Sequence, residues 1–340
     1  MPAVDVWTLI TVAGIALLVT GALAPIETLG WWAGWYGRYR EKTPAPLPHA
    51  EPPTSNHFVI FLTGIHTVSG TTFAGREINL LKELRKRLPD VAILEVFPYS
   101  VTNRALTGQR VFAWFWRWAL SMKLQKTLMA KIAGMVINLR NTWQVAVSAD
   151  RRYGPIYNHG SAQIILEQLL QNGYQIGSGA RVTLIGYSGG SQIALGAASH
   201  LKQMIGSPVD IISFGGIMSA DPGLLEIDHF YHLKGERDRI QRVGYIFFPG
   251  RWPLLAYSPW NQAKLNGKIT TITLGPVDHT GQEGYLDSKK TLADGRSYLQ
   301  QTVDTIVAII NKKSANPPLD EVGKHRTGRG TARDLSQTRR

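Results

Sequence analysis

The chain has 340 residues and a formal net charge of +13 at pH 7, and it contains no cysteine. The lack of cysteine excludes disulfides, thiolate zinc sites and cysteine nucleophiles. The positive charge favours an anionic partner, either nucleic acid or an acidic membrane surface. The length allows one large domain or two small ones.

The amino-terminal segment is apolar, and residues 6–24 form a run of 19 residues without a charge. A helix of this length spans roughly 28 Å, about the hydrocarbon thickness of a bilayer. The run predicts a transmembrane anchor within residues 1–42, with the aromatic side chains at 31–36 at the membrane interface. The alternative is a signal peptide cleaved after Ala24, but no Lys or Arg precedes the apolar run.

Basic residues follow this run and none precedes it: Arg38, Arg40 and Lys42. The positive-inside rule therefore predicts a single-pass membrane protein whose main domain lies on the cytoplasmic side. Residues 43–56 contain five prolines and are interpreted as a semi-rigid linker.

The main domain is expected to cover residues 57–312. Residues 57–62 and 91–97 are rich in apolar and β-branched residues, which predicts strands, and residues 75–88 have the pattern of an amphipathic helix. Residues 292–311 predict the final helix, and the polar, basic segment 313–340 is interpreted as a disordered tail.

Residues 98–160 are interpreted as an inserted helical cap. The stretch from 104 to 140 has many basic residues and no acidic one, and an aromatic cluster lies at Phe112, Trp114, Phe115, Trp116 and Trp118. Rings and cations together favour a lid that faces an anionic lipid surface. A helical pair packed on the body, with its cations in solvent, is the alternative.

The sequence around Ser188 suggests a nucleophile. Residues 182–185 predict a buried strand, residues 186–190 fit G-x-S-x-G, and small residues from 191 onward begin a helix. A serine on a sharp strand-to-helix turn is exposed at the edge of the sheet, and the glycines let strand and helix pass closely. Ser188 could also be an ordinary turn residue, because the pattern alone is weak.

This stretch resembles the nucleophile turn of the α/β-hydrolase superfamily, most of all its lipases and esterases, over roughly residues 56–312. That family orders its triad as Ser, then Asp or Glu, then His. After the predicted strand 227–233, Asp238 matches the acid, and after the strand 269–274, His279 matches the base. Asp221, which follows the strand 211–216, remains the alternative acid.

The resemblance implies an oxyanion hole from the N–H groups of Gly189 and Ile65, although the HGGG form of the second loop is absent. His66, beside this loop, could touch substrate but fits a structural role better. No metal-ligand spacing is found, and no cofactor is expected. No nucleic-acid-binding motif occurs, so nucleic acid is not expected as a partner.

The sequence therefore predicts an α/β fold: a mostly parallel sheet flanked by helices, with an inserted cap and one transmembrane helix. The expected activity is cleavage of a carboxylic ester or thioester, lipid-like in character, by Ser188, His279 and Asp238. The expected partners are a lipid membrane and a small ester or lipid substrate; the oligomeric state stays open. An amidase or peptidase with the same triad, or a non-catalytic membrane scaffold with this fold, are the alternatives.

Overall fold

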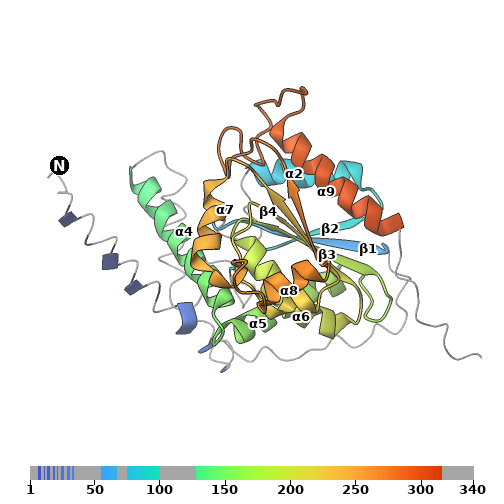
Figure 1. Cartoon of the computed structure of the whole chain (residues 1–340), viewed down its shortest axis with the longest axis horizontal. Helices are drawn as coiled ribbons and strands as arrows, with labels where there is room; N and C mark the ends of the chain where they lie inside the picture. The colour runs from blue at the N-terminus through green and yellow to red at the C-terminus, as the bar shows by residue number, and fades with distance from the viewer. Residues whose placement is uncertain are drawn as a thin grey trace, which may run out of the picture.

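The computed structural model describes residues 55–66, 75–99 and 128–315, with isolated residues between 7 and 33; for residues 128–134, 136 and 313–315 it describes the backbone alone. A six-stranded sheet with the strand order β2-β1-β3-β4-β5-β6 forms its centre (Figure 1). All neighbouring strands are parallel. The strands are β1 (His57–Leu62), β2 (Ala92–Val96), β3 (Arg181–Tyr187), β4 (Val209–Phe214), β5 (His229–Lys234) and β6 (Ile269–Thr273).

Helices cover both faces of this sheet (Figure 1). On one face lie α2 (Gly75–Arg87) and α9 (Tyr298–Ala315), and on the other lie α5 (Gly154–Gln171), α6 (Gly190–Ile205) and α8 (Pro259–Leu265). Two core clusters result, because successive side chains of a strand point to opposite faces: Leu184 of β3 belongs to one cluster and Ile185 to the other. The predicted α/β fold with its parallel sheet is therefore confirmed.

The strand order places a topological switch point between β1 and β3. The chain passes from β1 to β2 on one side, and then returns across β1 to β3 on the other side. In open parallel sheets, ligands bind at the carboxyl ends of the strands at such a point, because the loops leave the sheet in opposite directions there. The loops after Leu62 and Tyr187 are those loops.

The remaining elements surround this edge of the sheet. The helix α4 (Leu128–Ala149) lies beside α6, and α7 (Arg239–Phe247) follows β5 (Figure 1). Two short 3₁₀ helices flank β5 and α7 in the chain: η2 (Pro222–Leu225) comes before β5, and η3 (Pro249–Arg251) comes after α7. The last helix starts at Tyr298, later than predicted, because Thr291 and Ser297 pair across a turn in which Gly295 has a φ of +83°.

The predicted transmembrane helix is wrong. Among the residues described, no helix is long and apolar enough to cross a bilayer. The described part of the apolar run instead touches the body: a Cβ at Gly21 would lie 2.8 Å from the ring of Trp143, and Ala24 is buried in a core cluster. The predicted cytoplasmic-side location depended on this helix and is untested.

Several other predictions fall on residues outside the described ranges. They include most of the linker 43–56, the aromatic cluster at 112–118 and most of the tail 313–340. Of the predicted cap, α4 is described, and the side chains of Ile137, Val145 and Val147 are buried in the same core cluster as the α6 side chains. The end of α4 is thus part of the core, and the lid hypothesis for the preceding segment stays a prediction.

Candidate active site

Ser188 sits on a strained turn between β3 and α6. Its φ is +52°, in a region that residues other than glycine rarely adopt. A Cβ at Gly186 would lie 2.5 Å from the Cα of Ser191, and one at Gly190 would lie 2.5 Å from the carbonyl oxygen of Leu62. Both positions need glycine, so the G-x-S-x-G spacing is what allows β3 to turn sharply into α6.

The structure brings Ser188, His279 and Asp238 together in one chain of hydrogen bonds. The Oγ of Ser188 lies 2.9 Å from Nε2 of His279, and Nδ1 of the same ring lies 2.9 Å from Oδ2 of Asp238. A carboxylate can only accept, so the neutral ring carries its proton on Nδ1 and leaves Nε2 to accept the serine proton. This is the arrangement in which a histidine acts as a general base.

Asp238 is completely buried, and both of its carboxylate oxygens are hydrogen-bonded. It caps the N-terminus of α7, where Oδ1 accepts from the N–H of Gln241 at 3.0 Å. Oδ2 accepts from the His279 ring and from the hydroxyl of Tyr285 at 3.0 Å. Burial, followed by the nearby charge of Asp238, raises the pKa of Tyr285 above its ordinary value. Tyr285 therefore stays protonated and donates to the Asp238 carboxylate.

Tyr187 and Tyr285 hold the His279 ring. The Tyr187 ring stacks on it with a centroid distance of 5.8 Å, and its hydroxyl donates to the His279 carbonyl at 2.9 Å. Tyr285 meets the same ring edge-on at 6.4 Å and accepts from the N–H of Gly235 at 2.7 Å. The loop that bears His279 is thus tied to β3 and to the loop after β5.

The loop after β1 contributes Ile65, the second predicted oxyanion donor. The Tyr99 hydroxyl donates to the Thr63 carbonyl at 2.8 Å, and the Asn141 amide donates to the Ile65 carbonyl at 2.6 Å. A Cβ at Gly189 would lie 2.7 Å from Cγ2 of Ile65, so the two residues are in contact. Among the described residues, no hydrogen-bond partner occurs for the N–H of Ile65 or Gly189.

A buried carboxylate supports this loop from α2. Glu77 accepts from the Thr63 hydroxyl at 2.7 Å and from the Gly64 N–H at 3.3 Å, and it lies 3.6 Å from Nε2 of His66. Burial alone would raise the pKa of the Glu77 carboxyl, but the contacts with His66, Thr63 and Gly64 outweigh it and hold the pKa below its ordinary value. His66 is thus paired through its Nε2 side, although its ring still lines the cavity at Ser188.

The cavity in front of Ser188 has a volume of about 950 Å³. It lies between α4 and α7, and His279 lines it beside the serine. Most of its remaining wall is apolar, and includes Ile65, Leu139, Trp143, Val145, Ile217, Ile240, Val243 and Phe247. Ligand sites in proteins are typically apolar clefts of this size with a few convergent polar groups.

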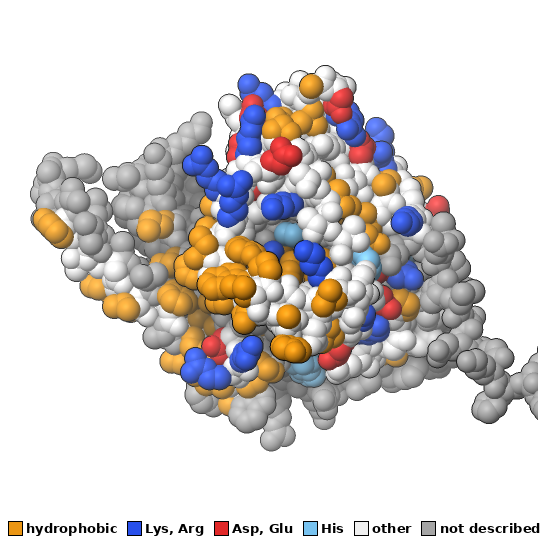
Figure 2. Space-filling model, in the orientation of Figure 1, with side chains coloured by type: hydrophobic (Ala, Val, Ile, Leu, Met, Phe, Trp, Pro, Cys, Tyr) orange, Lys and Arg blue, Asp and Glu red, His pale blue; other side chains and the backbone are white. Residues whose placement is uncertain are grey.

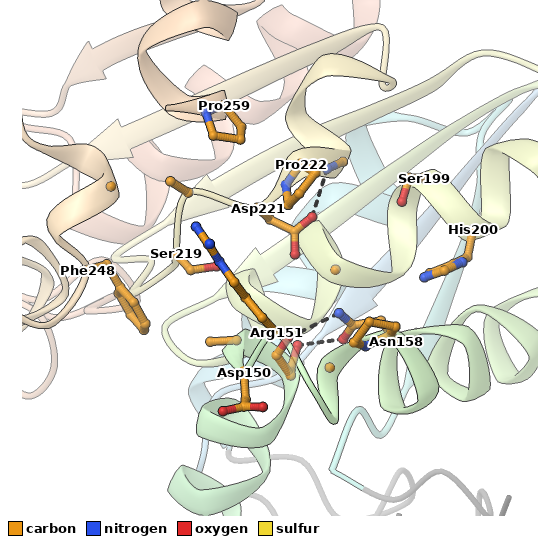
Figure 3. A pocket seen from close by; sticks show the side chains of 18 of the residues that line it. Asp150, Arg151, Asn158, Ser199, His200, Ser219, Asp221, Pro222, Phe248 and Pro259 are labelled. Atoms are coloured by element: carbon orange, nitrogen blue, oxygen red, sulfur yellow. Dashed lines mark hydrogen bonds between the residues drawn. The ribbon is translucent and has the colours of Figure 1, made fainter. Parts of the chain in front are cut away.

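The alternative acid, Asp221, lies in another cavity of about 760 Å³ (Figure 3). There it caps η2 by accepting from the N–H of Gly223 at 2.8 Å, and Asp150, Asn158 and His200 line the same cavity. Neither Ser188 nor His279 lines this cavity. The geometry therefore pairs His279 with Asp238.

Sequence comparison adds no relative: the chain matches no protein-family model, and no curated protein matches it. Within the described ranges, no group of three or more His, Asp or Glu residues could hold a metal ion.

Five residues that support the site were not predicted in that role: Glu77, Tyr99, Asn141, Tyr187 and Tyr285. Tyr285 follows His279 in the same loop, but no spacing rule links a loop tyrosine to an acid 47 residues earlier. Asn141 lies in the segment interpreted as a cap, where the basic and aromatic composition does not indicate a contact with the loop after β1.

Proposed function

We propose that the protein is a serine hydrolase of the α/β-hydrolase type that cleaves a carboxylic ester or thioester with an apolar acyl group. The observation that carries the proposal is the hydrogen-bonded chain from Ser188 through His279 to Asp238, built on a turn whose serine has a positive φ. The parallel sheet and its flanking helices are compatible with that fold.

The proposed reaction uses these groups in turn. Ser188 Oγ attacks the substrate carbonyl while Nε2 of His279 takes its proton, and the carboxylate of Asp238 stabilises the imidazolium. The N–H groups of Gly189 and Ile65 receive the oxyanion, and one such donor is typically worth about 3–4 kcal/mol. The imidazolium then protonates the leaving oxygen or sulfur, and water, activated by the same histidine, releases the acid from the acyl-enzyme.

The apolar cavity supports the choice of substrate. Its aliphatic and aromatic wall adjoins Ser188. Besides Ser188 and His279, the polar side chains that line it among the described residues are His66, Asn138, Thr142, Asp150, Tyr187 and Thr280. A bound acyl chain would cover this apolar wall and exclude water from it. Such burial stabilises a complex by about 25 cal/mol per Å² of apolar surface. An ester of a medium or long acyl chain fits these walls better than a charged peptide.

Hydrolysis of p-nitrophenyl esters by the full chain tests this proposal. Wild type should turn over the butyrate and octanoate esters, and Ser188→Ala should lose nearly all of this activity. Ser199→Ala is the matched control, because Ser199 lies in α6 but lines the cavity of Asp221. Activity of Ser188→Ala close to that of Ser199→Ala would refute the proposal.

A further inference from the structure

A third cavity, of about 570 Å³, lies on the other side of α7. The strands β5 and β6 form its floor, and α7, η3 and α8 surround it. The helix α7 separates it from the cavity at Ser188: Ile240, Val243 and Phe247 line that cavity, while Gln241 and Tyr245 line this one. Neither Ser188 nor His279 lines it.

The charged side chains that line this cavity are all basic. They are Lys234 of β5, Arg242 of α7, Arg251 of η3 and Lys264 of α8. Within the described part of the chain, no Asp or Glu lines the cavity. Figure 2 shows Lys, Arg and His side chains between α7 and α8, beside the apolar patch over α7. A polar surface normally mixes the two signs of charge, so four converging cations without an acid are unusual.

Among these four cations, Arg251 is buried and has few hydrogen-bond partners. Only 8% of it is exposed. Its guanidinium lies 4.1 Å from the Trp260 ring centroid and makes one long hydrogen bond, from Nη1 to the Met218 carbonyl at 3.4 Å. Among the described residues, its Nε donates to no atom and no carboxylate pairs with the guanidinium. Burial lowers the pKa of Arg251 to about 10, so it remains charged at neutral pH.

A buried cation without an anionic partner is costly, because its desolvation is not offset. Two further buried polar atoms beside it also lack partners among the described residues: Nδ1 of His232 and Oε1 of Gln241. Burial, together with the charges of Arg251 and Lys234, lowers the pKa of His232 to about 3, so its ring is neutral and can donate or accept. The cavity thus offers an unused donor at Arg251 Nε and, in one tautomer of the ring, a second at His232 Nδ1, whereas Gln241 Oε1 can only accept.

We propose that this cavity is a second binding site, which holds the phosphate group of a small molecule or of a lipid headgroup. A phosphate presents several acceptor oxygens and up to two negative charges, which match a guanidinium and nearby ammonium groups. The buried Arg251 is the fixed anchor at the base, and Lys234 and Lys264 close on the anion from the rim. The volume leaves room for an organic group beyond the phosphate itself.

Isothermal titration of the full chain with inorganic phosphate tests this site, with sodium chloride at equal ionic strength as the reference. Wild type should show saturable binding with a Kd on the order of 1 mM or tighter. Arg251→Gln should weaken binding by more than about tenfold, as expected when a charge-assisted contact is lost. Arg251 packs in the interior, so a second variant, Lys264→Gln, replaces an exposed side chain instead. The Lys264→Gln variant should weaken binding about threefold or more.

Arg239→Gln is the matched control, because Arg239 is an exposed cation of α7 that does not line the cavity. It should bind phosphate as wild type does. Equal weakening by Arg239→Gln and Lys264→Gln would overturn the proposal, since it would mean that the net charge attracts phosphate without a site. The absence of saturable binding to wild type would overturn it as well.

The same variants distinguish the two sources of phosphate. Glycerol 3-phosphate that binds wild type and not Arg251→Gln indicates a soluble phosphate ester. Sedimentation with phosphatidic acid vesicles that is lost in Lys264→Gln and kept in Arg239→Gln indicates a headgroup. Ser188→Ala should bind phosphate normally, so failure of the proposed hydrolase would not affect this result.

Discussion

Asp238 and Arg251 are both buried charges at the ends of the segment that contains α7, and their surroundings differ. Asp238 accepts hydrogen bonds from the Gln241 N–H, the His279 ring and the Tyr285 hydroxyl. Arg251 has a ring face and one long hydrogen bond. A fully paired buried charge is fixed in place and can orient a base without rearrangement. A buried charge that is incompletely paired is costly to desolvate, and this is why we propose a phosphate at Arg251.

The same helix carries both arrangements. Asp238 caps α7. The side chains at 240, 243 and 247 of this helix line the cavity at Ser188. Those at 241, 242 and 245 line the cavity that contains Arg251, which we call the basic cavity. These spacings follow the helical repeat, so one short helix separates an apolar wall from a basic wall. The two proposed ligands, an acyl ester and a phosphate, would therefore bind on opposite sides of one element.

The largest effect is expected when the paired charge is removed. Asp238→Asn should lower kcat for ester hydrolysis on the order of 10⁴-fold, because an amide can donate to Nδ1 and stabilise the wrong tautomer of His279. Steady-state kinetics on a butyrate ester measures this. Asp221→Asn is the control, and it should stay close to wild type. The reverse result would assign the acid to Asp221.

A second effect concerns pH, through His232 in the basic cavity. Its folded pKa of about 3 lies below the ordinary value of 6.5, so between these values the unfolded chain binds more protons than the folded one. Stability should therefore fall as the pH falls from 6.5, by about 2 kcal/mol at pH 5 from this residue. His57, which is buried with a pKa of about 4, adds to the same trend.

Urea unfolding at pH 7.5 and pH 5 measures this loss. In His232→Gln the difference between the two pH values should be smaller than in wild type by about 2 kcal/mol. An unchanged difference would mean that His232 is protonated in the folded protein and that the basic cavity is more hydrated than its burial suggests.

The contribution of Tyr285 to the pairing of Asp238 should be smaller. Tyr285→Phe removes one donor to the carboxylate and leaves the Gly235 N–H without its acceptor. We expect kcat to fall about tenfold, as for the loss of one hydrogen bond to a charged group. The midpoint of the pH profile of kcat/KM should also move. The Asp238 carboxylate loses one hydrogen-bond donor in this variant, and its interaction with the His279 imidazolium changes as a result. A lower Tm with unchanged kcat and an unchanged profile would make the tyrosine purely structural.

The smallest effect is expected at the apolar wall. Val243→Ser should lower kcat/KM for an octanoate ester by about fivefold to tenfold, since one aliphatic contact in a pocket is worth about 1–3 kcal/mol. The butyrate ester should be nearly unaffected. Leu265→Ser, at an exposed apolar residue of α8 that lines neither cavity, is the control. An equal loss on both esters would mean that the acyl chain lies elsewhere.

The grouping of Ser188, Asp238 and His279 was predictable from the sequence because each residue follows a strand that could itself be predicted. Ser188, Asp238 and His279 lie in the loops after β3, β5 and β6, and the carboxyl ends of parallel strands meet at one edge. The strands were visible as β-branched apolar runs. Tyr285 was not predictable, because a long side chain from a loop reaches the acid only once the whole loop is folded.

The basic cavity was not predictable either. Its cations come from β5, α7, η3 and α8, and no local pattern indicates that these short elements enclose one space. The apolar run at residues 6–24 has a clear sequence pattern, but the prediction made from that pattern is wrong. An uncharged stretch of residues satisfies the length rule for a bilayer, yet Gly21 and Ala24 contact the protein itself. Hydropathy alone does not distinguish a lipid neighbour from a protein one.

Labelling by a fluorophosphonate probe tests the central claim, the nucleophilic role of Ser188, most directly. The full chain is treated with the probe, its intact mass is measured, and the modified peptide is mapped. We predict one label per chain on Ser188, no label in Ser188→Ala, much slower labelling in His279→Ala and normal labelling in Lys264→Gln. A label on another serine, or equal labelling of wild type and Ser188→Ala, would contradict the account.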